Sequence, residues 1–275
     1  MSFYTSLSGL KGAQTDMSVV SNNIANAGSV GFKRSKAQFG DIFAASPNQS
    51  TKTIAGQGTR LNGSTQQFTQ GSYEASEKTL DMAIVGEGMF IVKGAPPTNA
   101  VSYSRNGAFT PLPDGRVVDT TGSTLQLLPV DANGDVTNRT LAGAFDLVLP
   151  PHAPGLPDVA LINMSVGLDG LVTATFADGS NQKMGKIAMA TFPAMEGLRP
   201  TGDAHWQSTG ESGPPKIDAP GNGAMGAVRS GALERSNVDI TEELVMLMAA
   251  QRNFQANAKA IEGAAQLTQT IIGMR

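Results

Sequence analysis

The chain contains no cysteine and only two histidines, His152 and His205, among its 275 residues. Without cysteine there can be no disulfide bond, no thiolate metal site and no cysteine nucleophile. Two histidines also argue against a metal centre built on several imidazole ligands. We therefore expect no metal site, no cofactor and no catalytic residues, and we do not expect an enzyme.

Charged side chains and long apolar runs are also scarce. Charged residues make up 16% of the chain and the net charge is −3, so no broad basic surface is available for nucleic acid or anionic lipid. The longest apolar run covers residues 244–250, far below the about 20 residues that cross a bilayer. The opening residues lack the basic start and apolar block of a secretory signal. We expect neither nucleic acid binding nor membrane insertion, and any export would use another route.

The first 27 residues carry apolar side chains at steps of three and four. This spacing predicts an amphipathic helix with a narrow apolar stripe over residues 3–27. The pattern stops before Gly28, a residue type suited to the end of a helix. The stripe consists of Phe3, Leu7, Leu10, Ala13, Met17, Val20 and Ile24.

A second helix of about 33 residues is predicted from Ile240 onward. Asp239 can cap it, and Glu242 and Glu243 place negative charge at its positive end. Two sets of residues recur at intervals of seven, as in coiled coils. One set is Ile240, Leu247, Phe254 and Ile261, and the other is Leu244, Gln251, Ala258, Ala265 and Ile272.

Narrow apolar stripes do not stabilise isolated helices in water, because helical stability comes mostly from packing. The two predicted helices therefore need each other or other neighbours. From periodicity alone two arrangements stay open. One is a helical hairpin within one chain, and the other is an assembly seam between subunits.

The sequence pattern in the middle of the chain predicts β-structure. Turn pairs such as Asn133-Gly134, Asp169-Gly170 and Asp178-Gly179 separate short apolar segments. Strands are predicted over residues 81–85, 90–92, 116–119, 125–128, 171–176 and 187–192. The fold class is α+β, with long terminal helices that pair as a coiled-coil-like hairpin and a mainly antiparallel β middle domain.

This pattern divides the chain into three parts. A discontinuous terminal-helix domain comprises residues 1–43 and 230–275. Residues 44–70 are polar and rich in Gly, Ser, Thr and Gln, and we expect an extended connector with one strand near residues 58–68. A β-rich outer domain covers residues 71–229, with a Pro-rich bridge near residues 150–165.

Two motifs suggest chemistry but have a simpler interpretation. Residues 131–135 resemble a calcium loop, yet the glycine stands fourth where that loop needs it sixth, so a hairpin turn is favoured. His205 and Trp206 lie near Asp203 without a serine in a strained turn, which favours local packing over catalysis.

Several short motifs occur at both ends and in the first part of the β-region. They are SLSGL at residues 6–10, VVSNNIAN at 19–26, GFK at 31–33, FGD at 39–41, LDMAIVGEGMF at 80–90, YSRNGAF at 103–109, GALERSNVD at 231–239 and AQRNFQANA at 250–258. Together they closely resemble the signature of bacterial flagellar rod and hook axial proteins. The positions that carry this resemblance include Asn22, Asn23, Ala25, Asn26, Gly31, Phe32, Asn237, Asp239, Gln251, Arg252 and Asn253.

Within that family, the opening MSFYTSLSGL and residues 186–192 and 196–198 are most similar to the hook members. Hook members commonly insert an outer β-domain, and residues 150–165 leave no room for one, so that domain is absent or vestigial here. Rod members are also compact and form the alternative. The distal rod member has extra residues after the position of Phe43, which we do not find in residues 44–70. Hook is therefore favoured over rod.

The resemblance implies a structural subunit of the flagellar hook, which polymerises into a helical tube and transmits torque as a flexible joint. Its partners would be further copies of itself, the rod and hook–filament junction proteins, the hook cap and the flagellar type III export apparatus. It would lie in the flagellum after export without a cleavable signal. The assembly seam would contain Leu7, Leu10, Met17, Val20 and Ile24, facing Ile240, Leu244, Leu247, Phe254 and Ile261.

Two other classes of protein stay open. A cytoplasmic enzyme would need a catalytic cluster, which we cannot assemble from this sequence. A monomeric adhesin or β-scaffold would keep both terminal helices ordered in dilute solution.

Overall fold

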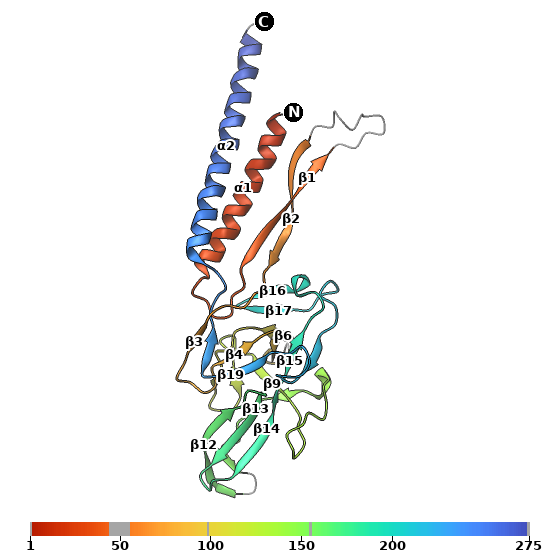
Figure 1. Cartoon of the computed structure of the whole chain (residues 1–275), viewed down its shortest axis with the longest axis vertical. Helices are drawn as coiled ribbons and strands as arrows, with labels where there is room; N and C mark the ends of the chain where they lie inside the picture. The colour runs from red at the N-terminus through yellow and green to blue at the C-terminus, as the bar shows by residue number, and fades with distance from the viewer. Residues whose placement is uncertain (1, 44–55, 98, 154–155, 274–275) are drawn as a thin grey trace. The chain divides into compact units, whose positions relative to one another are not determined.

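A computed structural model describes residues 2–43, 56–97, 99–153 and 156–273. It combines two long terminal helices with a mostly antiparallel β middle (Figure 1), which confirms the α+β class. The chain forms two compact units. Unit 1 comprises Met1–Ala27, Arg34–Gln67 and Val238–Arg275, and unit 2 comprises Gly28–Lys33 and Phe68–Asn237.

Unit 1 consists of two helices and a two-stranded ribbon. These elements are α1 (Ser2–Ala25), β1 (Ser35–Phe43), β2 (Gly56–Gln66) and α2 (Ile240–Gly273). Both helices have the extent that their apolar spacing predicts, and α1 and α2 lie side by side (Figure 1). A two-stranded ribbon is marginal alone, and here α1 packs against both of its strands.

A strand is expected near residues 58–68 of the connector, and the structure has strand β2 there. It pairs with β1 in antiparallel register from Ser35 opposite Gln66 to Phe43 opposite Gly56. The sequence did not predict β1, because SKAQFGDIF lacks a clear alternation of apolar and polar residues. Residues 44–55 of the expected connector lie outside the described residues.

Unit 2 contains short strands and two single turns of 3-10 helix. Its elements are β3 (Tyr73–Ala75), β4 (Met82–Val85), β5 (Met89–Lys93), β6 (Val101–Ser104), β7 (Thr110–Pro111), β8 (Val117–Val118), β9 (Thr124–Leu128), η1 (Leu141–Gly143), β10 (Phe145–Asp146), β11 (His152–Ala153), β12 (Leu156–Val166), β13 (Leu171–Phe176), β14 (Asn181–Ile187), β15 (Met189–Thr191), η2 (Met195–Gly197), β16 (Arg199–Gly202), β17 (His205–Gln207), β18 (Lys216–Asp218), β19 (Ala227–Ser230) and β20 (Ala232–Glu234).

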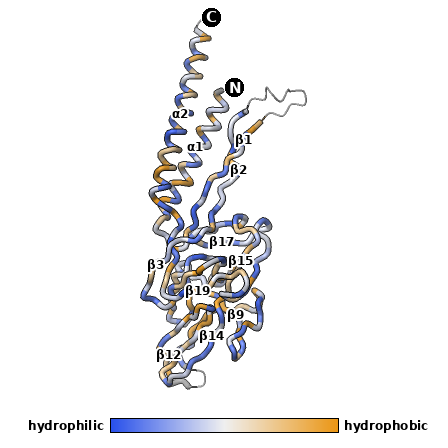
Figure 2. Tube along the Cα trace, in the orientation of Figure 1, coloured by the Kyte–Doolittle hydropathy of each residue, from blue (hydrophilic) through white to orange (hydrophobic). Residues whose placement is uncertain are grey.

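The largest sheet of unit 2 runs in the order β11-β12-β13-β14-β9-β5-β6-β17-β16, and every pairing is antiparallel. Hydrophobic segments run along its strands (Figure 2). One core cluster is built around Phe90, Phe109 and Leu125, and a second around Trp206 and Tyr103. Strand β13 buries every second residue, as its alternating sequence predicts.

The segment expected as a Pro-rich bridge contains strands β11 and β12 instead. Strand β12 pairs with β13 from Leu161 opposite Phe176 to Val166 opposite Val172. The prolines at 150, 151 and 157 lie outside that paired stretch, so they do not remove ladder hydrogen bonds from it. Residues 154–155 lie outside the described part of the chain.

The calcium-like run forms a turn. Asp131 Oδ1 accepts hydrogen bonds from the backbone N–H groups of Asn133, Gly134 and Asp135 at 2.8–3.0 Å. Val130 and Val136 bridge on either side of it. Among the described residues, no three His, Asp or Glu side chains gather into a group that could bind a metal ion. In the same part of the chain, neither helix is apolar enough over its length to cross a bilayer.

Candidate functional site

The two terminal helices bury small side chains where they meet. Ala13 and Val20 of α1 and Ala250 of α2 are among the buried residues of unit 1. A Cβ atom placed on Gly9 would lie 2.7 Å from the Asn257 side-chain oxygen, so glycine at position 9 allows α2 to approach closely. Small residues thus set the separation of the helices along this face.

The predicted seam residues are buried to different degrees. Val20 is 4% exposed, whereas Ile240 and Leu244 are 52% and 46% exposed. The other seam residues are half-buried, namely Leu7, Leu10, Met17, Ile24, Leu247, Phe254 and Ile261. Most seam side chains therefore keep part of their apolar surface in contact with solvent in the single chain.

A polar contact links α1, β1 and α2 within unit 1. Asn23 Nδ2 donates to Glu243 Oε2 (3.2 Å) and to Ser35 O (2.8 Å), and Ser35 N donates back to Asn23 Oδ1 (2.9 Å). Arg34 Nε lies 2.7 Å from Glu243 Oε1. Both Asn23 and Glu243 are buried. A buried amide or ion pair tolerates few alternative registers, so we expect this contact to favour one alignment of the two helices.

Asp239 caps the N-terminus of α2. Its Oδ1 accepts hydrogen bonds from Thr241 N at 2.8 Å and Glu242 N at 3.2 Å. These backbone hydrogen bonds hold the pKa of Asp239 below its ordinary value. The helix therefore begins at the residue that the sequence pattern indicates.

Loss of this cap gives a testable stability change. We expect Asp239→Ala to lower the midpoint of thermal unfolding by a few degrees, because two backbone donors at the start of α2 lose their acceptor. Asp239→Ser, which keeps a capping oxygen, should unfold close to the parent. Circular dichroism at 222 nm during heating measures both, and equal midpoints for the alanine variant and the parent would contradict the capping role.

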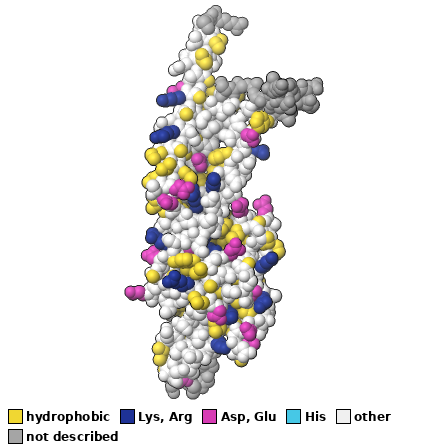
Figure 3. Space-filling view, in the orientation of Figure 1, with side chains coloured by type: hydrophobic (Ala, Val, Ile, Leu, Met, Phe, Trp, Pro, Cys, Tyr) yellow, Lys and Arg dark blue, Asp and Glu magenta, His cyan; other side chains and the backbone are white. Residues whose placement is uncertain are grey.

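Apolar side chains remain exposed along α2 (Figure 3). One group contains Leu244, Val245 and Met248, which are 46–57% exposed, and another contains Leu267, Ile271 and Ile272, which are 65–70% exposed. Spacings of three and four place members of each group on one side of the helix. Neighbouring exposed apolar side chains of this kind are a candidate contact surface.

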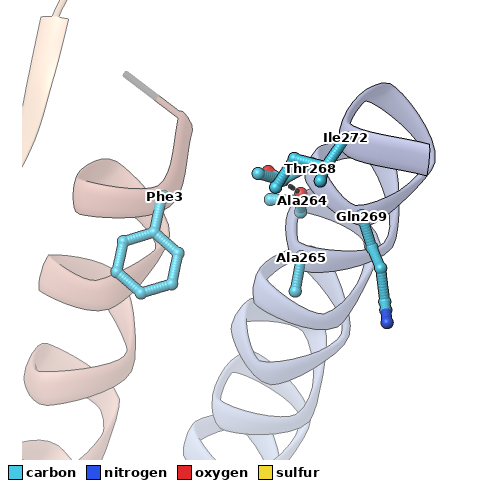
Figure 4. A pocket seen from close by; sticks show the side chains of 6 residues that line it. All are labelled: Phe3, Ala264, Ala265, Thr268, Gln269 and Ile272. Atoms are coloured by element: carbon cyan, nitrogen blue, oxygen red, sulfur yellow. Dashed lines mark hydrogen bonds between the residues drawn. The ribbon is translucent and has the colours of Figure 1, made fainter. Parts of the chain in front are cut away.

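An open apolar groove lies between the start of α1 and the distal part of α2 (Figure 4). Phe3 faces α2 across the groove, whose volume is about 510 Å³. Thr268 uses its hydroxyl to bond Ala264 O (2.8 Å) within its own helix. The remaining lining residues are Ala264, Ala265, Gln269 and Ile272. The groove is suited to apolar side chains rather than to a polar ligand.

The residues that carry the family resemblance differ in their hydrogen bonds and in their exposure to solvent. Asn26, Gly31, Asn237 and Asp239 make local or longer hydrogen bonds, such as Asn26 Nδ2 to Asn22 O (3.0 Å) and Gly31 N to Glu234 O (2.8 Å). Asn22, Ala25, Gln251, Arg252 and Asn253 are exposed, and Phe32 is half-buried. Hydrogen bonds therefore tie exposed members of this set, such as Asn22 and Asp239, into the fold as well as the buried Gly31.

Sequence reasoning missed a buried charge cluster in unit 2, formed by Lys33, Arg105 and Glu234. Lys33 Nζ lies 2.7 Å from Glu234 Oε1, and Arg105 NH1 lies 3.0 Å from Glu234 Oε2. The side chains of Lys33 and Glu234 are 0% exposed and that of Arg105 is 3% exposed. Burial lowers the pKa of Lys33 overall, although the Glu234 carboxylate acts in the opposite direction. We call these three residues the Glu234 cluster.

A local signal for the Glu234 cluster does exist in the sequence. Each member lies inside one of the motifs GFK, YSRNGAF and GALERSNVD. Gly31 in the first motif has φ +69°, and a Cβ there would lie 2.6 Å from the Arg105 carbonyl carbon. The motifs are far apart in the chain, so their spacing does not predict that the three charged side chains contact one another.

His205 forms a buried hydrogen-bonded pair with Asp119. Its Nε2 lies 2.6 Å from Asp119 Oδ2, and its Nδ1 lies 2.8 Å from Asp203 O. Burial alone would lower the pKa of His205, but the hydrogen bond and charge of Asp119 raise it overall. Burial alone would raise the pKa of Asp119, but hydrogen bonds from His205 and Thr121 lower it overall.

We expect this pair to make the stability of unit 2 depend on pH. The contribution of His205 is complete below its unfolded pKa of about 6.5 and is lost as the pH rises through its raised folded pKa. The contribution of Asp119 is complete above about pH 3.9 and is lost as the pH falls through its lowered pKa.

We expect His205→Gln to flatten the fall in unfolding free energy above about pH 6.5, measured by urea titration. His152→Gln, at an exposed histidine, is the control, and an unchanged pH profile for His205→Gln would contradict this account.

Comparisons with known proteins cover both ends and part of the β-region. Residues 3–33 match the family model "Flagella basal body rod protein" and residues 83–174 match "Flagellar hook protein FlgE/F/G D1 domain". Residues 229–274 match "Flagellar basal body rod FlgEFG protein C-terminal". These three matches include both terminal helices and the Glu234 cluster.

Curated relatives align over almost their whole length. The flagellar basal-body rod protein FlgG of Buchnera aphidicola subsp. Baizongia pistaciae is 33% identical, over 96% of this chain and 95% of the relative. FlgG of Bacillus subtilis is 30% identical, over 100% of this chain and 98% of the relative. The flagellar hook protein FlgE of Escherichia coli is 25% identical over an alignment of 410 residues that includes all of both chains. The chain therefore belongs to the family of flagellar rod and hook axial proteins and is a structural component of the bacterial flagellum.

Proposed function

We propose that this chain is a subunit of the flagellar hook, whose copies polymerise into a helical tube that transmits torque as a flexible joint. The observation that carries the proposal is the exposed apolar surface of α2, including Leu244, Met248 and Leu267. Such a surface costs free energy in water, and contact with other copies of the chain removes that cost.

In this proposal α1 and α2 pair as a coiled-coil-like hairpin and present the rest of their apolar seam to neighbouring subunits. Residues such as Leu10 and Met17 of α1 face Leu247 and Phe254 of α2, while exposed Leu244 contacts another copy. Head-to-tail contacts that do not close on themselves generate an open helical polymer. The division of the chain into a terminal-helix domain, a connector and a β-rich outer domain belongs to the same proposal.

Assignment to the hook rather than the rod rests on local resemblance. The opening MSFYTSLSGL and residues 186–192 are most similar to hook members of the family. The rod is the second candidate, and a specific observation favours it. The two rod relatives named above align at 30% and 33% identity with little difference in length, whereas the hook alignment extends to 410 residues because the hook relative is longer.

The proposal also names partners and a location. A hook subunit contacts further copies of itself, the rod below, the hook–filament junction proteins above and the hook cap during growth. It reaches the cell exterior through the flagellar type III export apparatus without a cleavable signal. None of these contacts involves nucleic acid or membrane insertion, and none requires a catalytic residue or a cofactor.

Electron microscopy of basal bodies from cells that lack this gene tests the assignment. If the chain is a hook subunit, basal bodies from the deletion strain should have a complete rod that ends at the outer surface and no curved hook. Re-expression of the gene should restore the hook. A truncated or missing rod would instead establish the rod alternative. Complete flagella in the deletion strain, with no paralogous gene expressed, would refute both.

A further inference from the structure

Four chain passages connect the two units, and they fall after residues 27, 33, 67 and 237. Three segments of unit 2 adjoin these passages, namely residues 28–33, 68–72 and 234–237. Any force that the covalent chain carries between the units enters or leaves unit 2 through these three segments. Contacts among them therefore decide how unit 2 responds to such a force.

All three segments are tied together around one carboxylate. Glu234 accepts from Lys33 Nζ through Oε1 at 2.7 Å, and the same oxygen accepts from Gly71 N at 3.0 Å. Its other oxygen, Oε2, lies 3.0 Å from Arg105 NH1, which belongs to the body of unit 2. The backbone carbonyl of Glu234 accepts from Gly31 N at 2.8 Å. Glu234 thus bonds the other two segments and also Arg105 in the body of unit 2.

A second group of bonds centres on Thr69. Its carbonyl oxygen accepts from Lys33 Nζ at 2.8 Å and from Asn237 Nδ2 at 3.1 Å, and its hydroxyl accepts from Asn237 Nδ2 at 2.9 Å. Arg235 N also donates to Ser72 O at 2.8 Å. Each of the three segments is therefore bonded to both others.

Burial makes these bonds hard to open one at a time. Glu234 and Lys33 are 0% exposed, so separating one partner leaves an unpaired charge away from water. Gly71 packs so closely that a Cβ there would lie 2.0 Å from Arg235 O. Stretching one segment therefore loads the other two as well.

We propose that the Glu234 cluster, with Thr69 and Asn237, is a mechanical clamp. The clamp bonds the three segments to one another, so that a force applied between the two units is shared by all three. Without it, the force would act on one segment at a time and separate β20 from β3. The clamp takes its biological meaning from the proposed torque-transmitting role, but its physical action does not depend on hook or rod.

Single-molecule pulling on the full chain tests the clamp. The chain has no cysteine, so handles can be attached at Gln255→Cys in α2 and Ser180→Cys in unit 2, both exposed positions. A second handle pair, Glu211→Cys and Ser180→Cys, lies within unit 2 and avoids the passages. We expect Glu234→Gln to shorten the lifetime of the unit 2 rupture step by roughly tenfold or more with the first pair, and by clearly less with the second.

The matched control is Arg235→Gln, which removes an exposed ion pair to Glu74 next to the clamp. It should change the lifetime by about twofold or less. If Glu234→Gln does not fold, Asn237→Ala replaces it, because Asn237 is only half-buried. Equal shortening with both handle pairs would show an ordinary stability effect and overturn the clamp, as would no shortening with the first pair. Electron microscopy of basal bodies from the deletion strain tests the proposed function separately.

Discussion

The Leu244→Asp variant is expected to fold but not to polymerise. Leu244 is 46% exposed in the single chain, so an aspartate there remains hydrated and costs the monomer little. In a polymer that covers this side chain, the same carboxylate would be buried without a partner. Together with the lost apolar contact, this should raise the concentration needed for assembly by roughly 100-fold or more.

Light scattering and negative-stain electron microscopy of purified protein measure that concentration. Gln255→Asp is the matched control, because it places the same charge at an exposed polar position of α2. Equal unfolding midpoints for parent, variant and control would show that the monomer is intact. Normal polymers from Leu244→Asp would mean that this side of α2 is not an assembly contact.

Gly107→Ala is expected to prevent folding of unit 2. A Cβ at this position would lie 1.6 Å from Met82 O and 2.7 Å from the Met82 carbonyl carbon. Met82 N donates to Gly107 O at 2.9 Å, so the two backbones cannot separate without losing that bond. The methyl group would also approach Phe90, which is 0% exposed and belongs to the main core. We expect a loss of at least about 4 kcal/mol, at the far end of single-residue effects.

Gly210→Ala is the matched control, because no heavy atom lies within 4 Å of a Cβ at that position. Far-UV and near-UV circular dichroism of the two variants measure the difference. The control should keep the near-UV signal of the packed Trp206, whereas Gly107→Ala should lose it. A native near-UV spectrum for Gly107→Ala would show that the backbones around Met82 can shift at low cost.

Features with a local cause were predictable from the sequence. The apolar spacing set the extent of α1 and α2, and Asp239 marked the start of α2 because a capping carboxylate acts only on the next three residues. The alternation in residues 171–176 gave β13 and its buried face. Each of these depends on residues within one or two turns or along one strand.

Features that depend on distant partners were not predictable. Strand β1 exists because it pairs with β2 and packs against α1, and its own sequence carries little β-pattern. The bridge expected near residues 150–165 is largely β12, because pairing with β13 outweighs the prolines around it. Lys33, Arg105 and Glu234 meet only in the folded chain, so the three motifs that contain them did not show that their charged side chains form one cluster.

The central proposal is that copies of this chain cover the apolar surface of α1 and α2. Hydrogen exchange of backbone amides in these helices, compared between monomer and polymer, tests it most directly. In the monomer, amides near Leu267 and Ile271 should exchange rapidly, because their side chains are 65–67% exposed and contribute little packing. In the polymer the same amides should be strongly protected. Full protection in the monomer, with no further change at concentrations that give polymers, would contradict the proposal.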